Sequence, residues 1–442
     1  MVRKNERKNE KPNLPMLRPN AAGIDVGATE VFVGVPPGRD KDSRDVRSFA
    51  TFTQDLYKLA DWLQQCEVDT VAMESTGVFW IPLFQILESR GLEVYLVNAR
   101  FVRNAPGRKT DVQDCQWLQY LHSVGLLQAS YRPAHAVCAL RTILRHRDSL
   151  VRSAARFIQR MQKALDQMNL KLHFVISDIT GLSGLRIIDS ILAGERDPNL
   201  LASLCHGRIK ASKDVVARSL QGDYRQEHLF TLRQSLQAYR HHQQLIEDSD
   251  REIERLLSEF ESSIALVDDR AEKQGRAFQL QRLFGVDLTR VPGLGIDTLE
   301  TVFGEVGPNL VKFRSASAFA SWLTVCPNNE VSGGKTLSRN TRKSKSRAAT
   351  ALRRAAQSMH HDKSWLGNFY RRMRARLGAP KAITATAHKL ARIIYHLVTL
   401  RQEYDESCYT MHQLRDQDRQ LRRLRKNAKA LGFDLSPCAD SL

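Results

Sequence analysis

The order of strand-like and helix-like segments in the first third of the chain limits the folds that it can adopt. Alternating or continuous apolar runs indicate strands, and longer runs with apolar residues three and four apart indicate helices. Two β-rich runs lie in AAGIDVGATEVFVGVPP, joined at Gly27, and a third strand lies in RDVRSFATF. A helix, a strand, a second helix, another strand and a last helix are then predicted, at 53–66, 68–76, 79–90, 92–99 and 110–127. Thr110 stands where an N-cap is expected for the last of these helices.

Three successive strands of antiparallel type, followed by strand–helix–strand–helix, are typical of a ribonuclease H-like domain. We therefore predict a mixed sheet with helices over residues 20–133. The segment before it, residues 1–19, is charged and contains Pro12 and Pro15, and it is predicted to be a flexible basic arm. The expected fold class is multidomain, with this α/β domain followed by mostly α-helical parts.

Four carboxylates stand at the ends of these elements. Asp25 lies in the first strand, within GIDVG, and Glu74 ends the fourth, within AMEST. Asp111 and Asp114 are three residues apart at the start of a helix and therefore share a face. In a ribonuclease H-like sheet the first and fourth strands are neighbours, so Asp25 and Glu74 are expected to meet. A site made only of carboxylate oxygens favours Mg²⁺ beside phosphate groups, and two such ions would assist phosphoryl transfer.

Other interpretations of these residues are open. Asp25 is also suited to a turn, and Asp111 to a helix N-terminus. The segment GIDVGATEVFVGV also resembles the first phosphate loop of actin-like kinases. Such an enzyme would need further glycine-rich loops, and residues 130–280 contain none.

The middle of the chain, residues 134–285, is predicted to be helical, with long helices over about 134–172 and about 223–262. The second helix has a seven-residue repeat that predicts a coiled-coil seam. Its two positions are Leu232, Tyr239, Ile246, Ile253 and Phe260, and Leu229, Leu236, Gln243, Asp250 and Leu257. Gln243 and Asp250 interrupt the seam. Two interpretations remain: a seam that also joins subunits, which we favour because an exposed stripe needs a partner, and a long helix packed within its own chain.

The last third contains the most basic segment. It opens with RVPGLGIDTLETVFGEVG, which resembles half of a helix-hairpin-helix, a motif that meets phosphate through backbone N–H groups. The turn NNEVSGGK follows, and residues 335–354 contain eight Lys or Arg and no Asp or Glu. A helical domain is predicted over 286–415, with a basic helical tail over 416–442.

The net charge of +19 indicates a polyanionic partner, and nucleic acid is favoured because neutralised phosphates release counterions. A membrane surface is the competing polyanion, but no apolar run is long enough to span a bilayer. The seven cysteines are scattered without a C-x-x-C pair, which argues against zinc ribbons and disulfide frameworks and for a reducing cytoplasm.

Several motifs, taken in order, make the chain resemble the insertion sequence 110 family of transposases, also called DEDD transposases or bridge-RNA-guided recombinases. The resemblance covers about residues 20–400. The motifs are GIDVG, MESTG, RKTDVQD, ITGLSG, AGERDP, VPGLG and CPNNEVSGGK.

The resemblance implies a RuvC-type nuclease fold with Asp25, Glu74, Asp111 and Asp114 as Mg²⁺ ligands, and a C-terminal transposase domain whose serine nucleophile maps to Ser332. Many relatives have a second serine or different spacing near Val331, and Ser338 is the alternative nucleophile. The resemblance also implies an oligomer, a dimer or tetramer, that works with donor DNA, target DNA and a structured guide RNA in a prokaryotic cytoplasm at the nucleoid, without a membrane. Basic residues expected to hold nucleic acid are Arg108, Lys109, Lys335, Arg339, Arg342, Lys343, Lys345 and Arg347.

The sequence therefore predicts a transposase that excises and integrates its own element by serine-mediated strand exchange. A serine hydroxyl needs activation by a base, a metal or a cationic field, and the carboxylate site is the expected source. Two alternatives remain: a RuvC-like structure-selective endonuclease that hydrolyses junction DNA, and a non-catalytic nucleic-acid-binding scaffold.

Overall fold

The structure is a computed structural model that describes residues 14–74, 77–98, 110–260, 275–338, 340–342 and 346–436. The chain folds as two compact units, residues 1–132 and 133–442. Of the predicted nucleic-acid contacts, Arg108, Lys109, Arg339, Lys343 and Lys345 lie outside the described residues.

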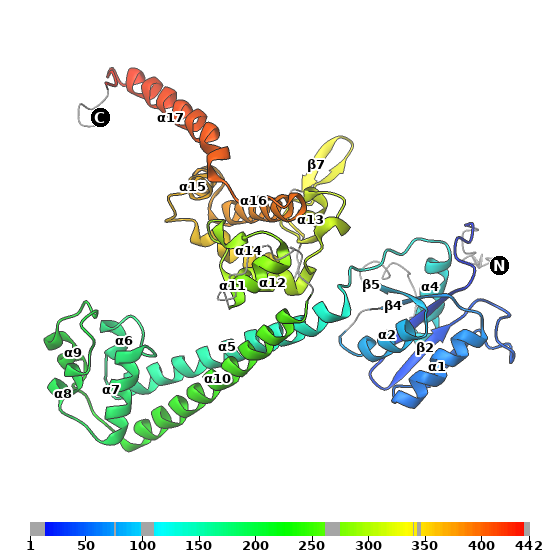
Figure 1. Cartoon of the computed structure of the whole chain (residues 1–442), viewed down its shortest axis with the longest axis horizontal. Coiled ribbons are helices and arrows are strands. Elements are labelled where there is room, and N and C mark those ends of the chain that lie inside the picture. Colours follow the sequence, from blue (N-terminus) through cyan, green and yellow to red (C-terminus); the bar gives the residue numbers. More distant parts are fainter. Residues whose placement is uncertain are drawn as a thin grey trace, which may run out of the picture. The chain divides into compact units, whose positions relative to one another are not determined.

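The first unit is a five-stranded mixed sheet with helices on both faces (Figure 1). The strand order is β3-β2-β1-β4-β5. The strands β1, β2 and β3 are antiparallel, whereas β4 is parallel to both β1 and β5, so the predicted mixed sheet is confirmed. The elements are β1 (Ala21–Val26), β2 (Glu30–Gly34), β3 (Val46–Ala50), α1 (Thr53–Gln65), β4 (Thr70–Glu74), α2 (Trp80–Ser89), β5 (Glu93–Val97) and α4 (Asp111–Ser123).

The two faces of this sheet are buried in different ways. Ile24 and Met73 point to one face, where they pack with leucines of α1 and α2. Ala72 and Val97 point to the other face, where Leu118 and Leu121 of α4 cover them. Because side chains alternate along a strand, Gly23 and Asp25 share the α4 face with Ala72 and Glu74.

Backbone lies directly against backbone where α4 crosses β1. A Cβ atom on Gly23 would stand 2.2 Å from the Gln119 nitrogen and 2.3 Å from the Cys115 carbonyl oxygen. On β2, which pairs Gly34 with Gly23, a Cβ on Gly34 would be 3.3 Å from the same carbonyl oxygen. The absence of side chains at these positions therefore sets how closely α4 approaches the sheet.

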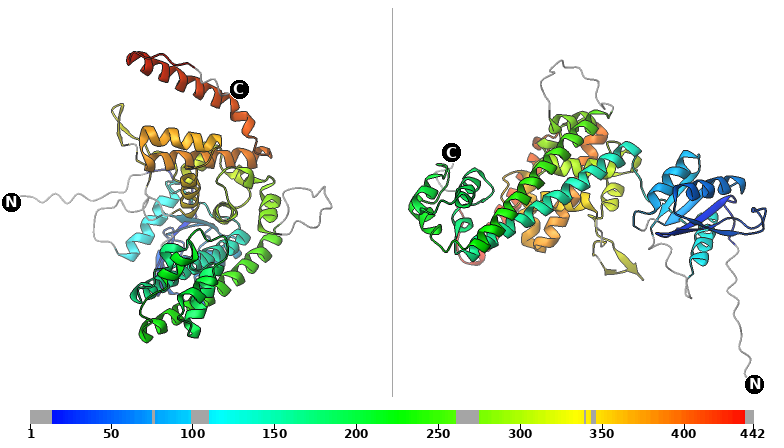
Figure 2. Two further views of the ribbon diagram at one scale, coloured as in Figure 1. Left: turned by 90° about the vertical axis from the view of Figure 1, so that its left-hand side faces the viewer. Right: turned by 90° about the horizontal axis from the view of Figure 1, so that it is seen from below.

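The second unit contains an antiparallel pair of long helices, α5 (His135–Gln167) and α10 (Gln226–Ser258), which lie side by side in Figures 1 and 2. Arg147 of α5 contacts Asp250 of α10, whereas Phe157, later in α5, contacts His242, earlier in α10, so the two helices run in opposite directions. The repeat residues of α10 are largely buried by packing within the same chain, as expected of a long helix folded back on its own partner. The predicted joining of subunits through this stripe stays a prediction.

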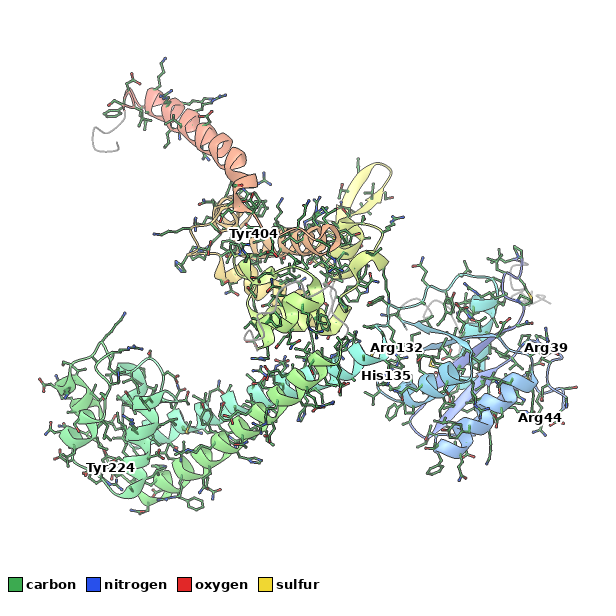
Figure 3. All side chains as sticks on the ribbon, viewed as in Figure 1. Arg39, Arg44, Arg132, His135, Tyr224 and Tyr404 are labelled. Atoms are coloured by element: carbon green, nitrogen blue, oxygen red, sulfur yellow. The ribbon has the colours of Figure 1, made fainter. Side chains whose placement is uncertain are left out.

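At one end of this pair, four short helices form a tip whose core is shared with the two long helices. Tyr224, labelled in Figure 3, belongs to this tip. Its hydroxyl donates to the Leu220 carbonyl at 2.6 Å, and the Arg196 guanidinium lies 4.6 Å from its ring centre. Burial raises the pKa of Tyr224. The helices are α6 (Leu172–Val175), α7 (Leu182–Ala193), α8 (Pro198–Ser203) and α9 (Lys213–Ser219).

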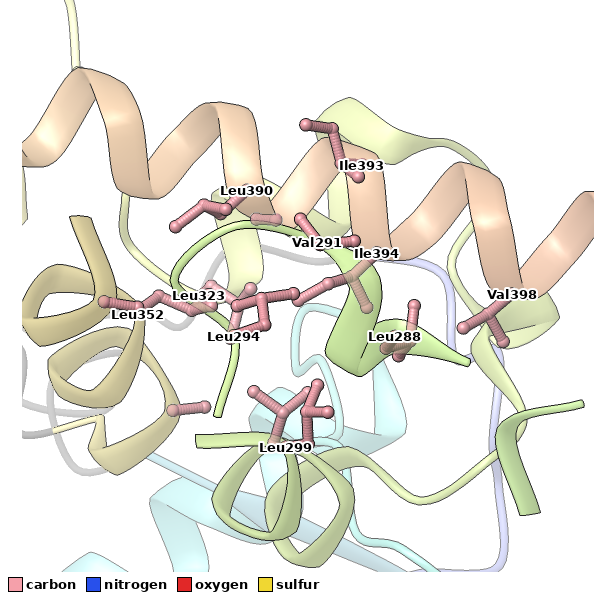
Figure 4. Packing of buried hydrophobic residues seen from close by; sticks show 14 of the residues in the cluster. Leu288, Val291, Leu294, Leu299, Leu323, Leu352, Leu390, Ile393, Ile394 and Val398 are labelled. Atoms are coloured by element: carbon pink, nitrogen blue, oxygen red, sulfur yellow. The ribbon is translucent and has the colours of Figure 1, made fainter. Parts of the chain in front are cut away.

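The remaining helices except α17 form a body around a large apolar core, part of which is shown in Figure 4. The VPGLG segment, which resembles half of a helix-hairpin-helix, lies in it: Val291 and Leu294 are buried, and Gly293, with a φ of 84°, leads into α12. The elements are α11 (Arg276–Phe284), η1 (Leu288–Arg290), α12 (Ile296–Val306), η2 (Leu310–Lys312), α13 (Ala316–Trp322), β6 (Glu330–Ser332), β7 (Lys335–Ser338), α14 (Arg347–Ser358), α15 (Trp365–Leu377), α16 (Ala379–Leu400), η3 (Glu406–Tyr409) and α17 (Thr410–Ala430).

A charged network joins α5, α10, α11 and α12. Asp250, one of the polar interruptions of the repeat, accepts from Arg147 at 2.5 Å and from Arg276 at 3.0 Å. Arg276 also donates to Glu300 at 3.1 Å, and the Glu300 side chain is 3% exposed. Burial raises the pKa of Glu300 to about 7, although Arg276 opposes the shift.

We expect Gly23→Ala to destabilise the first unit by at least about 2 kcal/mol, because the new methyl group meets backbone that cannot turn aside. Gly34→Ala, whose methyl group is only tightly packed, should cost clearly less. Urea unfolding followed by circular dichroism measures both. Equal, small losses for the two variants would contradict direct packing of α4 on β1.

The Glu300 carboxyl should make stability depend on pH. Its pKa in the folded state is above its ordinary value of 4.5. The folded state therefore holds the proton more tightly than the unfolded state. The contribution of Glu300 to stability is therefore greatest below about pH 4.5 and falls as pH rises to about 7, by about 3 kcal/mol at most.

Comparison with Glu300→Gln isolates this effect, because glutamine does not titrate. The unfolding free energy of the wild type minus that of the variant should fall between about pH 5 and about pH 7. Glu254→Gln, an exposed change on α10, serves as the control. Parallel pH curves for the wild type and Glu300→Gln would rule out the raised pKa.

Candidate functional site

The parallel pairing of β1 and β4 brings two of the predicted carboxylates to one edge of the sheet. Ile24 pairs with Met73 in this register, so the residues that follow, Asp25 and Glu74, lie next to each other. Both are partly exposed, and both belong to the face that α4 covers. The expected meeting of the first and fourth strands is thus found at the ends of β1 and β4.

The start of α4 points toward the same edge. The Gln119 side chain donates to the carbonyl of Ala21, at the beginning of β1, whereas Cys115 packs on Gly23, further along the strand. The helix therefore runs against the direction of β1, and its first turn, with Asp111 and Asp114, lies toward the Asp25 end. Thr110 caps this turn by accepting from the Gln113 N–H, as predicted.

Two of these carboxylates affect the pKa of the buried Cys115 thiol. Burial raises the pKa of Cys115 to about 12, and the negative charges of Asp25 and then Asp114 add to the rise. A charge on β1 and a charge on α4 therefore act on the same atom. Cys115 itself is fully buried on the α4 face and is a packing residue rather than a nucleophile.

The donor set suits a hard cation, because it contains carboxylate oxygens and neither thiolate nor imidazole. In the described parts of the chain, however, no group of three or more Asp, Glu, His or Cys side chains is close enough to hold a metal ion. Asp25 and Glu74 share the sheet edge, and Asp111 and Asp114 lie on the adjoining helix. The strands and the helix therefore place the four residues in one region, although their side chains do not form a group that could hold a metal ion in this structure.

The serine of the SGGK segment lies in the second unit, on the β6–β7 hairpin. Ser332 pairs with Lys335 across a two-residue loop, and both loop glycines have positive φ, 54° at Gly333 and 75° at Gly334. Two successive residues with positive φ are what a tight hairpin turn requires. The glycines therefore make the turn without help from the serine.

Ser332 and Ser338 differ in what their hydroxyls do. Ser332 is exposed at the end of β6, and its side chain forms no hydrogen bond within the described structure. Ser338 accepts a hydrogen bond from the Asn340 N–H at 3.3 Å. Ser338 thus has a local structural task, whereas Ser332 has none here. On both sides of the loop, Val331 and Leu337 are 61% and 70% exposed.

Three of the predicted basic contacts are described. Lys335 is exposed beside the loop. Arg342 donates to the carbonyl and the hydroxyl of Ser321, both at 2.8 Å. Arg347 starts α14 and donates to Asp148 of α5 at 2.7 Å. Arg342 and Arg347 are therefore tied to the body of the second unit.

Sequence reasoning missed a charged cavity of about 690 Å³ among α5, α12 and α14. Six arginines and four carboxylates line it: Arg141, Arg145, Arg147, Arg152, Arg347 and Arg354, with Asp148, Asp297, Glu300 and Glu305. The spacing of Arg141, Arg145 and Arg152, which places them on one face of α5, could have indicated a basic surface. The residues of α12 and α14 that complete the cavity lie far away in the sequence.

None of the helices in the described ranges is both long enough and apolar enough to cross a bilayer.

No curated protein matches the chain. Two family models do match it. Residues 22–170 match the model of IS110-type DEDD transposases, described as a transposase, and residues 287–371 match the transposase IS116/IS110/IS902 family. The first match contains the sheet and the four carboxylates, and the second contains Ser332 and the whole basic segment. Together the matches cover more than half of the chain, which therefore belongs to the IS110 family of transposases and is an enzyme that acts on DNA.

Proposed function

We propose that this transposase exchanges DNA strands through a covalent bond to Ser332, assisted by Mg²⁺ at Asp25, Glu74, Asp111 and Asp114. The observation that carries the proposal is the adjacency of Asp25 and Glu74 at the ends of β1 and β4, with the first turn of α4 directed to the same edge. The family of the chain supports a phosphoryl transfer on DNA.

The carboxylates would hold the ion and orient the scissile phosphate. When bound, Mg²⁺ would supply charge stabilisation for the developing negative charge. The chain itself contributes four carboxylates. The tight packing of α4 on β1 sets where the carboxylates of α4 lie relative to the ends of β1 and β4. Asp25 and Glu74 would bind from adjacent strands, and Asp111 and Asp114 from the helix.

In the proposed reaction, the Ser332 hydroxyl oxygen attacks the phosphorus of one DNA linkage and its proton is released. The bond from phosphorus to the leaving sugar oxygen breaks, and that oxygen takes up a proton. A free sugar hydroxyl of the second strand then attacks the phosphoserine ester, and the serine is restored. The bond energy is kept in the ester, so rejoining needs no nucleotide cofactor.

The partners complete the proposal. Donor and target DNA are the substrates, and a structured guide RNA selects them within an oligomer of this chain. The exposed Lys335, and Arg339, Lys343 and Lys345 near it in sequence, would neutralise backbone phosphates rather than identify bases. Arg108 and Lys109, which precede Asp111 in the sequence, would do the same for the first unit.

Ser332→Ala should abolish the covalent protein–DNA product and lower strand exchange by at least about a thousandfold, because no other group replaces the nucleophile. Ser338→Ala is the matched control on the same hairpin and should retain activity. The covalent species is trapped on cleaved DNA by denaturing electrophoresis, and the linked residue is mapped by mass spectrometry. DNA cleavage that survives Ser332→Ala would favour a RuvC-like hydrolase that uses water.

Asp25→Asn and Glu74→Gln should weaken Mg²⁺ or Mn²⁺ binding by about tenfold or more, measured by calorimetry on the whole chain, and should lower strand exchange in parallel. Glu30→Gln, an exposed carboxylate change on β2, is the control and should alter neither. Unchanged ion binding and full strand exchange in both variants would show that these carboxylates are structural.

A further inference from the structure

The cavity among α5, α12 and α14 lies entirely within the second unit and is formed by tightly packed elements. A Cβ on Gly304 of α12 would stand 2.6 Å from a methyl carbon of Leu144 on α5. Arg141 donates to the Gly304 carbonyl at 2.8 Å and to the Glu305 carbonyl at 3.0 Å. The wall between α5 and α12 is therefore preformed.

The carboxylates of the cavity are shared among more arginines than they can neutralise. Asp148 accepts from Arg152 at 2.6 Å and from Arg347 at 2.7 Å. Glu305 accepts from Arg145 at 2.8 Å and also faces Arg141, 3.6 Å away. Two carboxylates thus serve four guanidinium groups. The whole lining has six arginines against four carboxylates, so positive charge is left over.

Two further features increase this surplus. Arg354 is exposed, and no acidic side chain of the described residues pairs with it. Glu300 contributes less than a full negative charge near neutral pH, because burial raises its pKa to about 7. The Arg152 side chain is 61% exposed, so its donors are open to a ligand while it contacts Asp148.

The lining also limits what the ligand is. Of the described residues that line the cavity, none is aromatic, and the apolar ones are Leu144, Val151 and Ala351. A site for bases would offer aromatic faces for stacking. Planar guanidinium groups on several helices instead suit phosphate oxygens, which they bind through paired N–H groups.

We propose that this cavity binds the phosphodiester backbone of a nucleic acid, with Arg152 and Arg354 as the open contacts and Arg145 and Arg347, which also pair with carboxylates, as further contacts. The inference rests on the chain acting on nucleic acid, but it does not require the serine mechanism. The cavity would hold one or two consecutive phosphates without reading their bases.

The double variant Arg152→Gln with Arg354→Gln tests the cavity. Binding of a short DNA duplex, and of a single-stranded RNA of equal length, is measured by fluorescence anisotropy at several salt concentrations. The dissociation constant should rise about tenfold for the backbone that uses the cavity, and the slope of log affinity against log salt should fall by about 1 to 2. The probe that loses affinity identifies the nucleic acid.

The matched control removes two exposed positive charges from the tip of the long helices, with Arg208→Gln and Lys210→Gln. A loss of equal size in the control would show that only net charge matters, and unchanged binding of both probes to the cavity variant would also overturn the proposal. Binding needs no catalysis, so Ser332→Ala should bind as the wild type does, which separates this proposal from the mechanism.

A change of the opposite sign gives an independent test. Asp148→Asn frees Arg152 and Arg347 at once, so nucleic acid should bind about threefold more tightly, with a steeper salt dependence. Asp189→Asn frees Arg240 outside the cavity and is the control. The free energy of unfolding is measured for both, because Asp148 also joins α5 to α14. Weaker binding by a folded Asp148→Asn protein would contradict a phosphate site.

Discussion

The direct packing of α4 on β1 is the constraint on which the carboxylate edge depends. Gly23 places no side chain between the strand and the helix, so the Cys115 and Gln119 backbone comes within contact distance of the strand. A helix held at a longer distance by a side chain would carry Asp111 and Asp114 away from Asp25 and Glu74. The placement of the four carboxylates therefore depends on the lack of a Cβ atom at Gly23 and on the parallel register of β1 with β4.

The two groups proposed to react with DNA are held in very different ways. Asp25 lies one residue before the end of β1 and Glu74 ends β4, both in a five-stranded sheet whose register fixes their backbone positions. Ser332 stands on an exposed hairpin of two strands, a structure that has little stability of its own in water. The glycine pair shapes its loop, but nothing in the described structure fixes its hydroxyl. Contacts with the substrate or a partner would have to complete its orientation.

The sequence was most informative where local chemistry decides structure. Alternation of apolar residues predicted the mixed sheet, Thr110 predicted a helix start, and the glycine pair predicted a turn, because each depends on near neighbours in the chain. The seven-residue repeat predicted a buried face of α10 but not its partner, since the same stripe fits a second subunit or α5. The charged cavity was invisible for a related reason: Asp148 and Arg347 are 199 residues apart, and no pattern along the chain connects them.

Asp250 interrupts the apolar seven-residue repeat of α10, and its contacts explain why an acidic residue stands there. An acid in an apolar seam is costly unless a cation meets it, and here Arg147 and Arg276 both do. Through Arg276 and Glu300 the same network reaches α12, so the long helices are joined to the body by charges as well as by apolar packing. Arg147 and Glu300 also line the cavity. Because charged contacts respond to nearby anions and to pH, whereas apolar contacts respond weakly, a phosphate in the cavity would act on the groups that hold α5 and α12 together. Nucleic-acid binding at this place would then be coupled to the stability of the second unit, through the residues that interrupt its most regular element.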